Sequence, residues 1–380
     1  MYRNSNKKGY GDIEQSLYQK KNYKPKHNRT REKGQMKDLE IGGVSIKRGE
    51  TKRIELPMPP LYTDTRMSMP VHVQRGKRDG PTMFVSGAVH GDELNGIEIV
   101  NRLLKNKSLK YLKGTLIAVP IVNGYGVLNQ SRYLPDRRDL NRSFPGSSKG
   151  SIAGRLAHLF LNEVVSKCDV GIDLHTGAIH RSNLPQIRAD LDDAETFTMA
   201  ESFGLPVLLN ADIRPGTLRQ AAGDLGVKVL LYEAGEALRY DEFSIRAGVK
   251  GVVNVMREIG MLNKRQRKGH KISKFVARQS GWVRATESGF VNHAAQLGDH
   301  VNKGGVLAII ADPYGTELSK VLCPEEGVVI GKQNIPLTQE GEAMYHIAYF
   351  RKPDSVAEHL GLLQDNLLDD LVLDDPTIID

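Results

Sequence analysis

The chain has 380 residues, of which 39% are hydrophobic, and it carries a formal net charge of +8. This length and hydrophobic content are enough for two ordinary domains with buried cores. Its only cysteines, Cys168 and Cys323, are far apart, which excludes a disulfide-stabilised scaffold and favours a reducing compartment. It has no apolar run of about eighteen residues and no apolar core of a signal peptide near its start. We therefore expect a cytoplasmic protein without a membrane span.

The two ends of the chain differ in charge. Lysines and arginines, with tyrosines among them, crowd residues 1–40. A segment of this kind is usually a disordered, solvated extension, and the alternative, which stays open, is a tail that binds a nucleic acid or another acidic partner. Residues 353–380 contain no Lys or Arg and accumulate Asp, so they are interpreted as an acidic tail.

Between the tails, the predicted elements start with short antiparallel strands in residues 41–79, a region interrupted by Pro57, Pro59 and Pro60. From residue 82 onward, strand and helix patterns alternate. The expected strands are 82–89, 114–122, 169–174 and 227–232, and the expected helices are 94–104, 151–167 and 243–261. This alternation predicts an α/β fold with a mixed, mostly parallel sheet and helices on both faces, placed at residues 41–268.

Residues 269–352 show alternating strands and turns and no helix pattern. They resemble a biotinyl/lipoyl-carrier-like β-domain, so a small all-β barrel or sandwich is expected to follow the α/β domain. Where a carrier would present its modified lysine, this chain has Tyr314 in the sequence Asp-Pro-Tyr-Gly. We interpret this domain as a structural lid or wall beside the active site, without carrier function.

Three polar clusters follow predicted strands of the α/β domain. His90 and Glu93 come directly after the first strand, His175 ends a second and Glu233 ends a third. Parallel strands present such residues at one edge of the sheet, where ligands bind. Two histidines and one glutamate form a common catalytic zinc set that leaves one position open. The sequence therefore predicts a metal site of His90, Glu93 and His175, with a carboxylate nearby to move protons.

These clusters, together with the Asp-Leu-Asn-Arg-x-Phe-Pro-Gly run at residues 139–146, resemble the succinylglutamate desuccinylase/aspartoacylase family of the zinc carboxypeptidase clan. The resemblance covers roughly residues 80–350 in the same order. It implies one Zn²⁺ per chain held by His90, Glu93 and His175, and it implies that Glu233 activates the water.

The same resemblance implies that Asn141 and Arg142 grip a carboxylate of the substrate and that Arg132 polarises the scissile carbonyl. The loop also carries Arg137 and Arg138, so the choice among these three arginines for the carbonyl stays open. Arginine suits a carboxylate because its planar fork donates two parallel hydrogen bonds.

The expected function is zinc-dependent hydrolysis of a small N-acylated amino acid or a related amine that carries a carboxylate. A carboxypeptidase that trims a C-terminal residue and an inactive binding or regulatory homologue are the alternatives. His180, Arg181, Asn183 and Arg188 are interpreted as a loop near the metal that either contacts the substrate or is only solvated. The sequence leaves open whether the chain forms a homo-oligomer.

Overall fold

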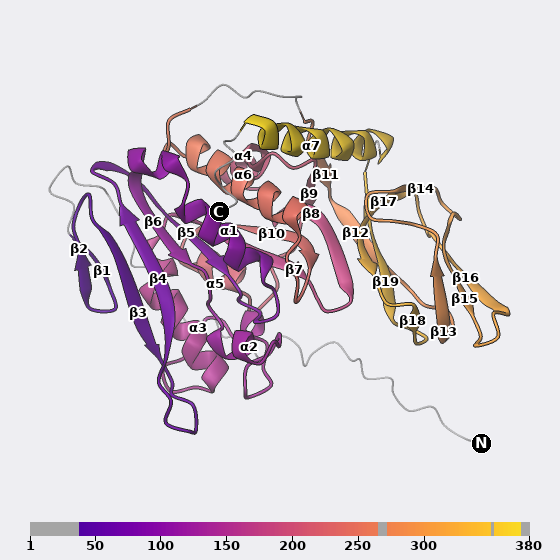
Figure 1. Ribbon diagram of the computed structural model, residues 1–380, viewed down its shortest axis with the longest axis horizontal. Coiled ribbons are helices and arrows are strands. Elements are labelled where there is room, and N and C mark those ends of the chain that lie inside the picture. Colours follow the sequence, from indigo (N-terminus) through magenta and orange to yellow (C-terminus); the bar gives the residue numbers. More distant parts are fainter. Residues whose placement is uncertain (1–37, 265–271, 351–352, 374–380) are drawn as a thin grey trace, which may run out of the picture. The chain divides into compact units, whose positions relative to one another are not determined.

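The computed structural model describes residues 38–264, 272–350 and 353–373 (Figure 1). Most of the basic tail predicted at residues 1–40 and the last residues of the predicted α/β domain, 265–268, therefore lie outside the described residues. The last seven residues of the acidic tail, 374–380, do so as well. The described part of the chain forms a large mixed sheet flanked by helices, followed by a separate small antiparallel sheet.

The large sheet combines strands from all three thirds of the chain. Its strands before residue 264 are β3 (Thr51–Met58), β4 (Met67–Arg75), β5 (Arg78–Gly87), β6 (Lys113–Val119), β7 (Val170–Gly177), β8 (Arg181–Ala189), β9 (Val207–Asn210) and β10 (Lys228–Glu236). Its later strands are β11 (Phe275–Ala277), β12 (Gln279–Arg284), β14 (His300–Val301), β17 (Gly327–Gln333) and β19 (Ala343–Tyr349). A short hairpin of β1 (Leu39–Ile41) and β2 (Val44–Ile46) precedes it.

The centre of the large sheet is parallel, in the order β6-β5-β7-β10. On one side, β4 and β3 continue the sheet in antiparallel fashion, as the proline-interrupted lead-in predicted. On the other side, β8 pairs antiparallel with β10 and with β17. The carboxyl ends of β5, β7 and β10 therefore lie side by side, and polar residues that follow or end these strands meet there.

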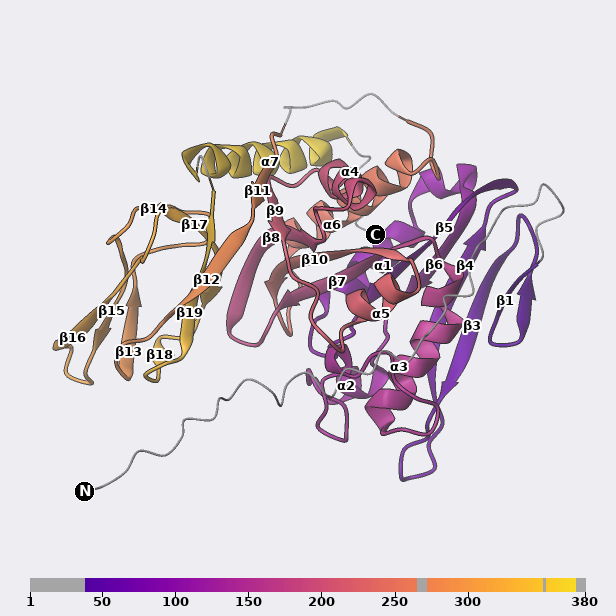
Figure 2. The same cartoon turned by 180° about the vertical axis from the view of Figure 1, so that it is seen from behind.

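Helices cover both faces of this sheet (Figures 1 and 2). One face packs against α1 (Asn95–Leu104), α4 (Ala194–Phe203) and α6 (Glu242–Glu258), and the other against α3 (Ile152–Glu163) and α5 (Leu218–Asp224). The remaining short helices are α2 (Gly124–Leu128), η1 (Lys107–Tyr111), η2 (Leu140–Arg142) and η3 (Val165–Lys167). Each face has its own hydrophobic core. Successive residues of a strand point to opposite faces, so Val85 of β5 is buried in one core and Phe84 in the other.

Polar side chains fix where several of these helices begin. Asp241 caps α6 by accepting a hydrogen bond from the Ser244 amide at 2.9 Å, and Ser151 caps α3 through the Gly154 amide at 3.1 Å. Each cap satisfies one of the backbone N–H groups that a helix start leaves unpaired. The observed starts lie within one residue of the expected ones, at Glu242 and Ile152.

The small antiparallel sheet has the order β16-β15-β13-β18. Its strands are β13 (Gly289–His293), β15 (Val306–Ala311), β16 (Glu317–Leu322) and β18 (Leu337–Thr338). In the turn between β15 and β16, Tyr314 is 94% exposed, at the position where the sequence comparison placed a carrier lysine.

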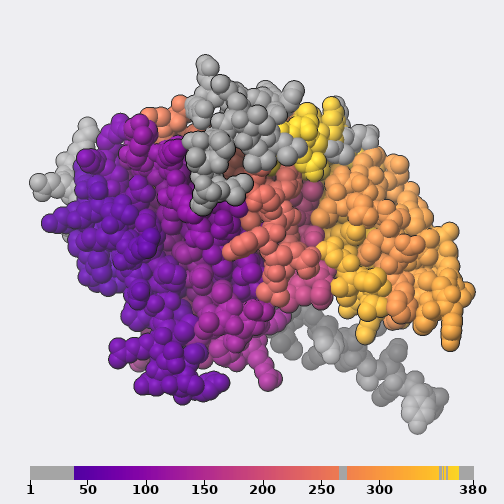
Figure 3. All heavy atoms as spheres, in the orientation of Figure 1, coloured from indigo at the N-terminus to yellow at the C-terminus, as the bar shows by residue number. Residues whose placement is uncertain are grey.

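The last described element is α7 (Pro353–Leu373), which occupies most of the predicted acidic tail. This helix packs against α6, β14 and β17, and in Figure 3 its yellow atoms are visible at the molecular surface. Leu360, Leu363 and Leu367 lie on its buried side, while Glu358 and Asp365 are exposed. Within residues 38–264, 272–350 and 353–373, no helix is both long and apolar enough to span a membrane.

Candidate metal centre

The turn that carries His90 and Glu93 follows β5 directly and closes with a hydrogen bond from the Glu93 amide to the His90 carbonyl oxygen at 3.2 Å. Gly91 is required in this turn because the chain passes very close to α2. A Cβ atom on Gly91 would lie only 1.9 Å from the carbonyl carbon of Gly126. The turn therefore fixes both side chains against a neighbouring helix.

His90, Glu93 and His175 come together as a compact, buried group. The Glu93 Oε1 atom is 2.8 Å from the His90 Nδ1 atom, and the Glu93 Oε2 atom is 2.7 Å from the His175 Nδ1 atom. The two Nδ1 atoms are 3.2 Å apart. Each of the three side chains is at most 3% exposed. Three ligand atoms thus converge on one point, as the spacing of the strand ends predicts.

A carboxylate lies behind each of the two histidines. The His175 Nε2 atom is 2.7 Å from Asp173 Oδ2, and the His90 Nε2 atom is 3.0 Å from Asp139 Oδ1. Carboxylates only accept hydrogen bonds, so each Nε2 atom carries a proton and each Nδ1 atom is available to a metal. Ser86 in turn donates to Asp173 Oδ1 at 2.7 Å. The donor set is therefore oriented by a second layer of polar groups.

The charges of the centre favour a cation. Burial disfavours the protonated form of His175, but the carboxylates of Asp173 and Glu93 outweigh it and raise the pKa of that histidine. The pKa of His90 is raised in the same way by Glu93 and Asp139, against its burial. The pKa of Glu93 is lowered, because the two histidines outweigh the effect of burial. The site therefore attracts positive charge, which fits a divalent metal.

The residues present fit a metal ion in number and in type. Among the residues that the structure describes, His90, Glu93 and His175 are the group whose ligand atoms all lie within 4.8 Å of one another. Two imidazoles and one carboxylate are the donors that catalytic zinc sites use, and three protein ligands leave a position for substrate or water. We therefore identify this group as a metal site.

Glu233 lies next to this site on the neighbouring strand. In the parallel pair of β10 and β7 it is in register with His175, so the two side chains project from the same face of the sheet. Its Oε2 atom accepts a hydrogen bond from Asn183 Nδ2 at 2.5 Å, and its Oε1 atom is 3.7 Å from the guanidinium of Arg188. The Glu233 side chain is 15% exposed. Glu233 is therefore a carboxylate that is oriented by its neighbours and is accessible to solvent.

Of the three arginines in the loop before Asp139, the structure brings Arg132 to the metal centre. Its Nη1 atom donates to Glu93 Oε1 at 3.1 Å, and its Nη2 atom donates to Asp139 Oδ2 at 3.1 Å. Arg137 and Arg138 are exposed.

Asn141 and Arg142 lie on η2, beside the same loop. Asn141 is buried, and its Oδ1 atom accepts a hydrogen bond from the Leu218 amide, the first residue of α5, at 2.9 Å. Arg142 is exposed, and its Nη1 atom donates to the Asn141 carbonyl oxygen at 2.6 Å. Asn141 therefore has a structural contact in addition to the substrate role that the sequence comparison implied.

The residues predicted as a loop after His175 form a strand instead. Only His180 belongs to the turn, with a φ of 63°, and β8 starts at Arg181. The prediction of a loop was wrong because β8 is buried on both faces through its middle and shows no clear alternation. Asn183 and Arg188 reach Glu233 from this strand, and no local sequence pattern signals that contact.

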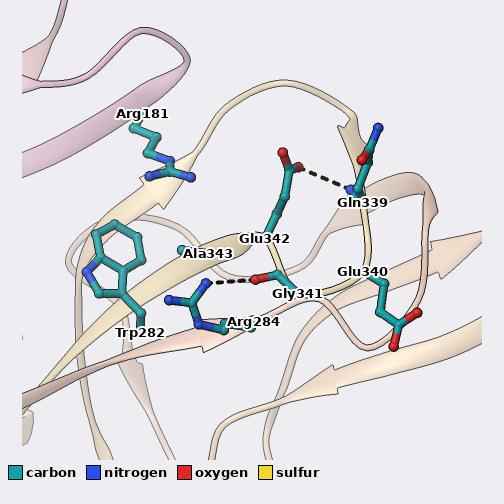
Figure 4. Close-up of a pocket in the computed structure, with 8 residues that line it drawn as sticks. All are labelled: Arg181, Trp282, Arg284, Gln339, Glu340, Gly341, Glu342 and Ala343. Atoms are coloured by element: carbon teal, nitrogen blue, oxygen red, sulfur yellow. Dashed lines mark hydrogen bonds between the residues drawn. The ribbon is translucent and has the colours of Figure 1, made fainter.

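An open pocket of about 600 Å³ is lined by Arg181 at the start of β8, by Trp282 and Arg284 of β12 and by the turn before β19 (Figure 4). Arg181 stacks over the ring of Trp282 there, with 5.4 Å between the guanidinium carbon and the ring centroid. None of the residues that line this pocket is a ligand of the metal site or Glu233. The pocket is therefore separate from the metal centre.

Comparisons with known proteins match part of the chain to a known family. Residues 79–259 match the family model of the succinylglutamate desuccinylase/aspartoacylase catalytic domain. The N-alpha-acetyl-L-2,4-diaminobutyric acid deacetylase of Halomonas elongata is 28% identical over 253 residues, which are 63% of this chain and 72% of that protein.

Two solved structures share the fold. The succinylglutamate desuccinylase/aspartoacylase of Rhodobacter sphaeroides has a TM-score of 0.73 at 23% identity, over 81% of this chain and 98% of that one. The product-bound ectoine utilization protein EutE (DoeB) of Ruegeria pomeroyi has a TM-score of 0.73 at 24% identity, over 80% of this chain and 97% of that one. Residues 79–259, which hold the His90, Glu93 and His175 metal site, therefore form a deacylase domain of the succinylglutamate desuccinylase/aspartoacylase family.

Proposed function

We propose that this protein is a zinc-dependent deacylase, with one Zn²⁺ per chain, that hydrolyses the amide of an N-acyl amino acid or a related carboxylate-bearing amine. The observation that carries the proposal is the register between Glu233 and His175 on adjacent parallel strands. It supplies a carboxylate that is not a ligand, on the same face of the sheet as the ligand His175. The Halomonas elongata relative, an N-acetyl amino acid deacetylase by name, supports the same substrate class.

Each residue of the site has a distinct task in this proposal. His90, Glu93 and His175 would hold the zinc, which supplies a Lewis acid for the amide carbonyl and lowers the pKa of water. Glu233 takes the proton of the attacking water on a carboxylate oxygen and delivers it to the nitrogen of the leaving amine. Asn183 keeps that carboxylate oriented through its 2.5 Å hydrogen bond.

The arginines handle the charge of the substrate. Arg132 donates to the carbonyl oxygen in this proposal, and the contact of its guanidinium with the ligand Glu93 supports that role. The exposed Arg142 binds the substrate carboxylate through its fork, and the Asn141 side-chain amide nitrogen adds a donor. Arg142 thereby selects substrates that carry a negative charge near the scissile amide.

A panel assay tests this function. The zinc-loaded protein is incubated with N-acetyl amino acids, N-succinyl amino acids and short peptides, and the freed amine is measured. Release of the amine from the acyl amino acids, and its loss in Glu233→Gln, is the expected result. Release of a C-terminal residue from the peptides alone would establish the carboxypeptidase alternative, and no release from any of them would reject the proposal.

A further inference from the structure

The pocket in Figure 4 contains the only tryptophan of the chain, Trp282. Its volume of about 600 Å³ is within the range of sites that bind small molecules. One face of the indole is covered by His346, whose ring lies at a centroid distance of 4.7 Å and an interplanar angle of 9°. Trp282 is nevertheless 38% exposed. A large aromatic side chain that is fixed on one face and still exposed in a pocket is well suited to contact a ligand.

Two arginines line the pocket beside this tryptophan. The guanidinium carbon of Arg181 is 5.4 Å from the centroid of the Trp282 ring, and within the described residues this guanidinium forms no hydrogen bond or ion pair. Arg284 lies two residues after Trp282 on β12, and its Nη1 atom donates to the Gly341 carbonyl oxygen at 2.7 Å. In the described part of the chain, the other nitrogens of Arg284 have no partner. Most of the donors of both arginines are therefore available to a ligand.

Two glutamates from the turn before β19 line the same pocket. Glu342 Oε2 accepts a hydrogen bond from the Gln339 amide at 3.1 Å, which holds its carboxylate in place. Figure 4 shows Trp282 and Arg181 at one side of the pocket and Glu340 at the other. Among the residues that the structure describes, neither glutamate forms an ion pair. The pocket therefore presents positive and negative groups that do not neutralise each other by direct contact.

This arrangement favours a ligand that carries both charges. An arginine fork binds a carboxylate through paired hydrogen bonds, and a glutamate accepts charged hydrogen bonds from an ammonium group. An anion alone would be repelled by the glutamates, and a cation alone by the arginines. A free α-amino acid carries a carboxylate and an ammonium group on one carbon atom. Its side chain would lie near the apolar surface of Trp282.

We propose that this pocket binds a free α-amino acid, with its carboxylate on Arg181 and Arg284 and its ammonium group on Glu340 and Glu342. None of these residues is a metal ligand or Glu233, so the site is additional to the metal centre. The deacylation proposed above would release an amino acid, but the binding itself does not depend on that reaction.

The fluorescence of Trp282 tests the ligand class, because the chain has no other tryptophan. The metal is first removed with a chelator, so that no turnover takes place. We expect L-leucine to cause a saturable change in the emission. N-acetyl-L-leucine lacks the ammonium group and L-leucinamide lacks the carboxylate, so each should bind about tenfold more weakly or worse. Equal binding of the three compounds would overturn the proposal.

Variants measured by calorimetry test the position of the site. Arg181→Gln and Arg284→Gln should each weaken the binding of L-leucine about tenfold or more, and Arg181→Lys should restore part of it. Arg278→Gln, which alters a surface arginine paired with Asp192, is the matched control and should bind normally.

Arg142→Ala separates this pocket from the proposed substrate site. We expect this variant to bind L-leucine as the wild type does. A loss of binding in Arg142→Ala, normal binding in Arg181→Gln, or no binding by either method would overturn the proposal. If the zinc-loaded protein hydrolyses no amide but L-leucine binds as expected, the proposed function fails and the amino acid site stands.

Discussion

Asp173 and His175 lie on the same face of β7, two residues apart, and the Asp173 Oδ2 atom is 2.7 Å from the His175 Nε2 atom. A strand places alternate residues on one face, so this spacing brings a carboxylate directly behind a ligand. Asp139 has the same relation to His90, but it comes from a loop 49 residues later. Each histidine thus contacts a carboxylate through its Nε2 atom, but one carboxylate comes from the same strand and the other from a distant loop.

Replacing Asp173 should weaken metal binding without removing a ligand. In Asp173→Asn the ring loses its charged acceptor, and we expect the zinc affinity to fall roughly tenfold to a hundredfold. Competition with a metal chelator measures this change. Asp169→Asn, which alters an acid near the start of the same strand, is the control. An unchanged affinity in Asp173→Asn would contradict the role assigned to Asp173.

Replacing His175 should remove the metal. Without one of three ligands, His175→Ala is expected to lose zinc from a chain that otherwise carries about one ion. Elemental analysis of the dialysed protein checks this. Full zinc content in this variant would show that the site lies elsewhere.

Glu233→Gln should separate metal binding from turnover. The amide keeps the shape of the carboxylate but cannot take a proton, so zinc should be retained while kcat falls by roughly 100-fold or more. Metal content and steady-state rates are measured on the same preparation. Glu236→Gln, which alters the carboxylate that accepts a hydrogen bond from the His180 amide, is the matched control. Near-normal rates in Glu233→Gln would make Glu236 the next candidate for the base.

The effect of replacing Arg142 should depend on whether the substrate carries a free carboxylate. If Arg142 binds that group, Arg142→Ala should lower kcat/KM for the charged substrate about tenfold to a hundredfold. The same variant should scarcely affect the methyl ester of that substrate, which has already lost the interaction. Equal losses for acid and ester would mean that Arg142 only stabilises η2.

Two glycines give opposite expectations for stability. Gly91→Ala places a Cβ atom 1.9 Å from the Gly126 backbone, so we expect a loss of about 3 kcal/mol or more, together with a disturbed metal site. Gly223→Ala, in the last turn of α5 with no atom within 4 Å of the new Cβ, should raise stability by roughly 0.5 to 1 kcal/mol. Urea unfolding of both variants measures the difference.

Much of this arrangement can be predicted from the sequence. Apolar periodicity indicates the strands and helices, and the polar residues at the strand ends indicate the metal ligands. His90, Glu93 and His175 were predicted in this way and are brought together as a metal site. The contacts of Arg188 with Glu233 could not be predicted. They depend on the pairing of β8 with β10 across about 45 residues, which no local pattern encodes. The extension of the large sheet into β17 was missed for the same reason.

That extension has a consequence for how the chain can be divided. β8 hydrogen-bonds to β10 on one side and to β17 on the other, and β9 pairs with β11. A protein shortened after residue 264 would expose one edge of β8 and one of β9, both with apolar residues. Unprotected edges of this kind recruit strands from other molecules. The strands after residue 272 therefore keep the catalytic sheet from self-association, whatever they contribute to substrate binding.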